Sequence, residues 1–158
     1  MAGNENAVMR SKKQSFELRP AIPDDLNFAW RLYRDSMKPL TEELMTWKEE
    51  KQHAVIEAEI SSGQASIIVV GGVSVGWMLV REQADEIELC QLYIEPSRQN
   101  RGIGSEIITG LMREARENSK PLTLQVVKIN RAYALYERLG FIQTGASEYK
   151  RHMTWKAD

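Results

Sequence analysis

Residues 86–106 combine three features whose order restricts how the chain can fold. The segment Ile87–Ile94 is rich in β-branched, aromatic and other apolar residues, and Pro96 follows it, so it predicts a β-strand. Apolar residues then recur at helical spacing from Ile107 to Ala115. A short polar segment with a Gly-x-Gly sequence lies between them. We therefore expect a strand, a tight turn and a helix in immediate succession.

A turn in this position is suited to binding an anion. The first backbone N–H groups of a helix have no partner within the helix, and the helix dipole favours negative charge there. Arg98 and Arg101 add positively charged side chains to the same segment. The predicted ligand is a phosphate or pyrophosphate group. A helix-capping loop without a ligand is the alternative when the turn is considered alone.

Two common phosphate-binding motifs do not fit this turn. The loop of ATPases requires a lysine after its last glycine, but Gly104 is followed by Ser105 and Glu106. The dinucleotide-binding motif requires a third glycine where this chain has Ile107. The sequence QNRGIG at Gln99–Gly104 instead resembles the Gln/Arg-x-x-Gly-x-Gly/Ala signature of the GNAT superfamily, the acyl-CoA-dependent N-acyltransferases.

A second segment strengthens this resemblance. Residues Asn130–Phe141 read NRAYALYERLGF, which is similar to the second GNAT signature: an asparagine, a short helix with Leu-Tyr, then Leu-Gly-Phe. The two motifs occur in the expected order, with a predicted helix and a predicted strand between them. The resemblance covers about Phe16–Trp155.

Local patterns predict the remaining elements. One helix opens at Pro23 and fades near Pro39, and a second is capped by Thr41 and runs to about Ile60. Further predicted elements are the strands 16–19, 65–70, 73–81, 122–127, 141–144 and 149–155 and the helix 131–139. This order predicts an α/β fold with a central mixed sheet flanked by helices on both faces. We expect a flexible N-terminal tail at 1–14 and a single domain at 15–158.

Composition excludes several classes of function. The net charge of −1 gives no sign of nucleic-acid binding. Cys90 is the only cysteine, and His53 and His152 are far apart, so no metal site is predicted. The uncharged stretch Ile60–Val80 approaches the length of a membrane span, but polar residues and Gly71-Gly72 interrupt it. We predict a soluble cytoplasmic protein that does not bind a membrane, and the sequence is compatible with a homodimer.

The GNAT resemblance implies acetyl-CoA as cosubstrate, held between the strands 87–94 and 122–127. Main-chain groups at the end of the first strand would bind pantetheine, and backbone N–H groups of the turn would bind the pyrophosphate. A backbone N–H near Tyr93 or Ile94 would donate to the oxyanion. The implied cofactor-binding residues are Leu92, Tyr93, Ile94, Gln99, Asn100, Arg101, Gly102, Ile103, Gly104, Ser105, Asn130 and Tyr136.

The resemblance also suggests catalytic roles. Tyr136 lies where the family places the acid that protonates the departing thiolate, and Tyr133, one turn earlier, is its substitute. Glu88 is the candidate base for the acceptor amine, with Glu86 or water as alternatives. Cys90 is disfavoured as a nucleophile because no histidine lies near it in the sequence.

The sequence therefore predicts an N-acetyltransferase that uses acetyl-CoA and a primary amine, in a small molecule or a protein, by direct attack in a ternary complex. One of Trp30, Tyr33 and Trp47 is expected to line the acceptor pocket. A non-catalytic acyl-CoA-binding regulatory module is the alternative function. The sequence does not select the acceptor or the acyl-chain length.

Overall fold

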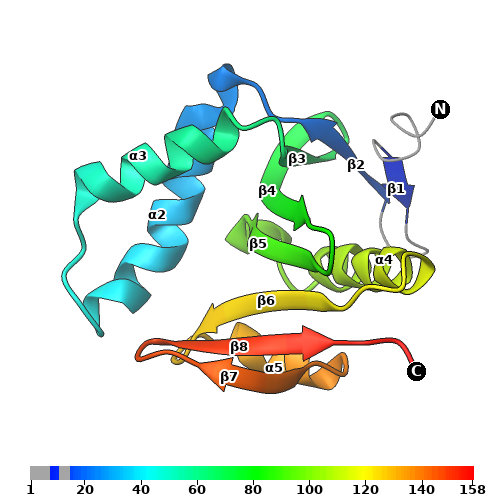
Figure 1. Cartoon of the computed structure of the whole chain (residues 1–158). Coiled ribbons are helices and arrows are strands. Elements are labelled where there is room, and N and C mark those ends of the chain that lie inside the picture. The colour runs from blue at the N-terminus through cyan, green and yellow to red at the C-terminus, as the bar shows by residue number, and fades with distance from the viewer. Residues whose placement is uncertain (1–7, 11–14) are drawn as a thin grey trace. The chain divides into compact units, whose positions relative to one another are not determined.

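The computed structural model describes residues 8–10 and 15–158 (Figure 1). The chain forms two compact units. The first contains the residues up to Leu79 together with Gln91–Glu106, and the second contains Val80–Cys90 and Ile107–Asp158. The predicted mixed α/β fold, a mixed sheet flanked by helices, is confirmed.

The first unit contains the strand order β1-β2-β3-β4-β5, in which β1 to β4 pair antiparallel. The strands are β1 (Val8–Arg10), β2 (Ser15–Pro20), β3 (Ala65–Val70), the first part of β4 (Val73–Glu82) and the last part of β5 (Ile87–Ile94). Its helices are η1 (Pro23–Asp25), α2 (Leu26–Glu42), α3 (Glu49–Ile60), η2 (Pro96–Arg98) and the first turn of α4 (Ile103–Glu117).

The second unit contains the strand order β5-β6-β8-β7. The β5–β6 pair is parallel and the other two pairs are antiparallel, which makes the sheet mixed. Besides the end of β4, the start of β5 and most of α4, the elements are β6 (Leu122–Val127), α5 (Ala132–Arg138), β7 (Ile142–Ala146) and β8 (Lys150–Trp155).

A buried tryptophan joins helix and sheet in the first unit. Trp77 of β4 is completely buried, and its Nε1 donates to the carbonyl oxygen of Ala29 in α2 at 3.2 Å. Next to it, a Cβ at Gly76 would lie 2.3 Å from the carbonyl oxygen of Tyr93. Only glycine therefore allows β4 and β5 to approach this closely.

Side-chain alternation along β6 organises the second unit. Leu122, Leu124 and Val126 are buried, whereas Thr123 is only partly buried and Gln125 is exposed. This is the period of two expected for a strand with one apolar and one polar face. One face of the strand thus contributes to the core, and the other carries polar side chains.

The predicted boundary between the two N-terminal helices is wrong. Helix α2 continues through Pro39 to Glu42, so Thr41 lies inside it and caps no second helix; α3 begins only at Glu49. Proline removes one backbone donor, and Pro39 is exposed with a single helical turn left after it. The cost at this position is therefore small enough for the helix to continue.

Most predicted strands are confirmed to within one or two residues, but β1 was not predicted. The backbone of β1 pairs with β2, with Val8 opposite Glu17 and Arg10 opposite Ser15. The other residues of the predicted tail lie outside the described residues, so the tail stays a prediction.

Within the described part of the chain, no helix is long and apolar enough to cross a membrane. Nor do three or more His, Cys, Asp or Glu residues gather there as metal ligands would.

An ion pair stabilises the junction between β2 and η1. Asp25 is 9% exposed; its carboxylate accepts hydrogen bonds from Arg19 Nη1 and Nη2 at 2.9 and 2.8 Å and from the Ile22 N–H at 2.8 Å. The hydrogen bond from Arg19 is the main cause that lowers the pKa of Asp25. The charged form of Asp25 therefore contributes to the stability of the folded state.

We predict that Asp25→Asn lowers the free energy of unfolding by about 1–3 kcal/mol at neutral pH, because Arg19 loses a charged acceptor. The contribution is complete above the pKa of Asp25 in the unfolded chain and is lost as pH falls through its lower folded-state pKa. The difference between wild type and variant should therefore shrink in acid. Urea denaturation at neutral and acidic pH measures both effects, with the exposed Asp24→Asn as control. An equal loss at both pH values would contradict this account.

Candidate active site

The turn before α4 has the backbone geometry of an anion site. Asn100 and Gly102 both have positive φ, 62° and 90°, and α4 begins at Ile103. The carbonyl oxygen of Gly102 accepts the first-turn hydrogen bond from the Glu106 N–H at 2.9 Å. Apart from its two chain neighbours, a Cβ at Gly102 would meet no atom of the described residues within 4 Å. The turn therefore has open space beside Gly102, just before the start of the helix. Binding of an anion at this turn stays a prediction.

One contact fixes this turn to the end of β5, and a second joins that end of the strand to α2. The Gln99 Nε2 donates to the carbonyl oxygen of Ile94 at 2.8 Å. Arg31 of α2 pairs with Glu95, with Nη2 and Oε2 2.7 Å apart. Both Gln99 and Ile94 are predicted from the sequence to bind the cofactor. The structure shows that the side chain of one engages the main-chain oxygen of the other.

Asn130 lies at the start of α5, in the second unit. Its Oδ1 accepts a hydrogen bond from the Ala132 N–H at 2.9 Å, and its own N–H donates to the Val127 carbonyl oxygen at 2.8 Å. The oxygen of its side chain is thus engaged in forming the helix start. The NH₂ group has no partner among the described residues and remains for the predicted contact with pantetheine.

The two tyrosines of α5 differ in how their hydroxyls are engaged. The Tyr133 hydroxyl donates to Glu137 Oε2 at 3.1 Å, and Arg151 lies 4.6 Å from the Tyr133 ring centroid. The half-buried Tyr136 packs edge-on against Phe141 with 5.8 Å between centroids, and its hydroxyl has no partner in the described part of the chain. Burial raises the pKa of Tyr136 to about 12, so it stays protonated at neutral pH.

The parallel pairing of β5 with β6 is short. It covers three residue pairs, from Ile87–Leu122 to Leu89–Leu124, whereas β6 pairs with β8 as far as Val127. The predicted separation of the two strands beyond these pairs stays a prediction.

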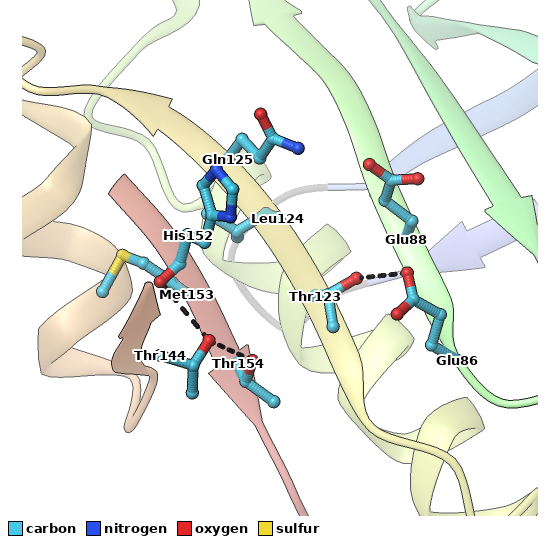
Figure 2. Close-up of a pocket in the computed structure, with 9 residues that line it drawn as sticks. All are labelled: Glu86, Glu88, Thr123, Leu124, Gln125, Thr144, His152, Met153 and Thr154. Atoms are coloured by element: carbon cyan, nitrogen blue, oxygen red, sulfur yellow. Dashed lines mark hydrogen bonds between the residues drawn. The ribbon is translucent and has the colours of Figure 1, made fainter. Parts of the chain in front are cut away.

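A polar pocket of about 280 Å³ lies on the sheet of the second unit (Figure 2). Strand alternation and the order β5-β6-β8 bring its lining to one face. A register shift between Gln143 and Gly145 places Thr144 of β7 beside this face. The lining residues are Glu86 and Glu88 of β5, Thr123, Leu124 and Gln125 of β6, Thr144 of β7, and His152, Met153 and Thr154 of β8.

The two carboxylates of the pocket are held differently. Thr123 Oγ1 donates to Glu86 Oε2 at 3.0 Å, as Figure 2 shows. The Glu88 carboxylate has no hydrogen bond or ion pair to any described residue. The Cys90 thiol lies 3.6 Å from Arg81 Nη1 and 3.8 Å from the Glu88 carbonyl oxygen. Glu88 is thus the carboxylate available to a ligand.

From the sequence, His152 was weighed only as a metal ligand, and its place in this pocket was not predicted. His152 is opposite Gln125 in the β6–β8 register, and both line the pocket. The alternation of polar and apolar residues in 150–155 put His152 and Thr154 on one face. That pattern does not say which strand lies beside β8, and so it could not place His152 near Glu88.

The predicted aromatic residues form a cluster in the first unit. Ring centroids of Trp30 and Trp47 are 6.2 Å apart, and those of Tyr33 and Tyr93 are 5.5 Å apart. The Tyr33 hydroxyl donates to Gln52 Oε1 at 2.8 Å, and burial, with the charge of Glu59, raises the pKa of Tyr33 to about 12. These contacts are those of packed side chains, and a role in an acceptor pocket stays a prediction.

Comparison with known proteins identifies the family. The model of the acetyltransferase (GNAT) domain matches residues 36–156. The fold is similar to the PaiA N-acetyltransferase of Thermoplasma acidophilum solved with coenzyme A, with 18% identity, a TM-score of 0.69, and 91% of this chain and 100% of that chain covered. An acetyltransferase of Thermus thermophilus is also 18% identical, with a TM-score of 0.72 and coverages of 92% and 99%. Because the family model spans more than half of it, the chain belongs to the GNAT acetyltransferase family.

Proposed function

We propose that the protein is an N-acetyltransferase that transfers the acetyl group of acetyl-CoA to a primary amine. The observation that carries this proposal is the turn at Asn100–Gly104. Its positive φ angles and open space at the start of α4 suit a pyrophosphate group. Family membership supports the reaction class, and the coenzyme A bound to the Thermoplasma protein supports the cosubstrate.

The proposed cofactor contacts fall into two groups. In the first unit, the main chain of Leu92, Tyr93 and Ile94 would bind pantetheine, and N–H groups of Asn100–Ser105 would bind the pyrophosphate. Gln99 would act by holding the turn against Ile94, since its side chain is already engaged there. In the second unit, Asn130 would donate from its NH₂ group.

The proposed chemistry is direct attack of the neutral amine on the thioester carbonyl. Tyr136 would donate to the sulfur as the C–S bond breaks, because its hydroxyl keeps its proton and has no partner among the described residues. The acceptor ammonium must first lose a proton. Glu88 is the candidate base from the sequence, with Glu86 or water as alternatives, and the Thr123 hydrogen bond makes Glu86 the less available of the two.

Isothermal titration with CoA and acetyl-CoA, followed by a free-thiol release assay, tests the proposal. The acceptor panel should contain small primary amines and peptides with free N-termini or lysines. We expect binding of both cofactors and thiol release with at least one amine. Binding without turnover on any acceptor would instead favour a non-catalytic acyl-CoA-binding module. Absence of binding would overturn the assignment of the turn.

A further inference from the structure

We infer that His152 is the base that takes a proton from the acceptor amine. This inference rests on the proposed function and assigns a step that the sequence left open between two carboxylates and water. In this assignment Glu88 and Glu86 attract the ammonium group, and His152 accepts its proton.

The surroundings of His152 leave its imidazole available. The ring lines the pocket beside Gln125 (Figure 2), and neither ring nitrogen has a hydrogen-bond partner among the described residues. A Cβ at Gly145 would lie 3.7 Å from Nδ1, an ordinary van der Waals contact, so Gly145 of β7 lies beside this side of the ring. Thr144 Oγ1 lies 2.8 Å from Thr154 Oγ1 and 3.5 Å from the His152 carbonyl oxygen. These contacts hold β7 against the backbone of β8.

The charges around the ring favour a cationic ligand. The titratable groups that face the pocket from β5 are Glu86 and Glu88. Strand β6 presents Thr123 and Gln125, and β7 presents Thr144, none of which titrates. On β8 itself, Lys150 has the same side-chain parity as His152 and is exposed. The pocket lining thus carries two carboxylates and no lysine or arginine, which favours an ammonium group.

Imidazole suits the proton transfer better than a carboxylate. A general base works best when its pKa is near the working pH; imidazoles titrate there, whereas carboxyl groups titrate well below it. The ammonium loses one proton to His152, and the amine then forms the C–N bond. As the C–S bond breaks, Tyr136 protonates the sulfur and regains the proton that leaves the nitrogen. His152 releases its proton to solvent, so each turnover yields amide, thiol and one proton.

The test compares pH profiles of wild type and His152→Gln. In wild type, kcat/KM should rise with pH through the range in which imidazoles titrate. In the variant it should fall about 10²-fold at neutral pH and follow only the ionisation of the amine itself. Affinity for CoA, measured by calorimetry, should not change. His53→Gln alters the other histidine, which packs against Trp30 in the first unit, and should keep the wild-type pH profile.

A matched pair of acceptors separates a base from a structural residue. Ethylamine is protonated at neutral pH, whereas its trifluoro analogue is largely neutral and needs no base. The loss in His152→Gln should therefore be large with ethylamine and close to none with the analogue. An equal loss with both acceptors, or an unchanged pH profile, would overturn the inference. The inference would also be overturned if Glu88→Gln, and not His152→Gln, removed the rise of kcat/KM with pH near neutrality. We expect Glu88→Gln only to raise KM.

A binding measurement covers the case in which neither amine turns over. The imidazole C–H resonances of the CoA-saturated protein are followed by NMR as ethylamine is added. His152 should shift and His53 should not, and a silent His152 would overturn the inference. Failure of the proposed function is distinguishable, because it appears in the wild type itself: either CoA is not bound, or acetyl-CoA is bound and no amine of the panel releases thiol.

Discussion

Gly104→Arg should abolish the binding of CoA and acetyl-CoA, with an affinity loss of at least about 100-fold, or roughly 3 kcal/mol, in isothermal titration. Gly104 is the second residue of α4, and a Cβ built there would lie 3.5 Å from Ile94 Cδ1 and, apart from its own helix, within 4 Å of no other atom in the described part of the chain. An arginine side chain would extend into the space beside the first helical N–H groups. It would fill the volume that we propose for the pyrophosphate.

Gly104→Ala is the matched control. Its methyl group would lie 3.5 Å from Ile94 Cδ1, an ordinary contact, and alanine is a better helix former than glycine. This variant should bind CoA as wild type does, and thermal unfolding should show that both variants fold. Retained binding by Gly104→Arg would overturn the assignment of this turn to the cofactor.

Tyr136→Phe should lower kcat by about 10²–10³-fold while leaving the affinity for CoA nearly unchanged. The substitution removes the hydroxyl but keeps the ring that packs against Phe141. Burial raises the pKa of Tyr136 to about 12, so the wild-type hydroxyl remains a donor throughout the pH range of the assay. If the wild-type rate falls at a pH well below the pKa of Tyr136, the ionisation of another group must therefore cause the fall.

Tyr133→Phe is the control for this prediction. The Tyr133 hydroxyl donates to Glu137, so its removal should change kcat little. Single-turnover thiol release and calorimetry separate chemistry from binding in both variants. If Tyr136→Phe keeps the wild-type kcat, Tyr136 has no part in the mechanism; if only Tyr133→Phe loses activity, the two roles are exchanged.

The sequence predicted the elements whose signals are local. The turn at Gln99–Gly104 and the segment Asn130–Phe141 carry their conformations in their own residues, through glycines and helical spacing. Apolar periodicity similarly predicted most strands, because burial repeats every second residue along a strand. The boundary between α2 and α3 was predicted wrongly because Pro39 and Thr41 are strong local signals. Neither signal ended the helix, because an exposed proline so near the helix end costs little.

The fold class, the family resemblance and the glycine turn before α4 were all readable from the sequence, since each depends on neighbouring residues. Which side chains share the pocket depends on how the strands pair in the folded sheet. His152 faces Gln125 because β8 pairs with β6, and Glu88 lies on the same face because β6 also pairs with β5. Such pairings join segments far apart in the chain. They are set by the packing of the whole sheet, which no local pattern of residues encodes.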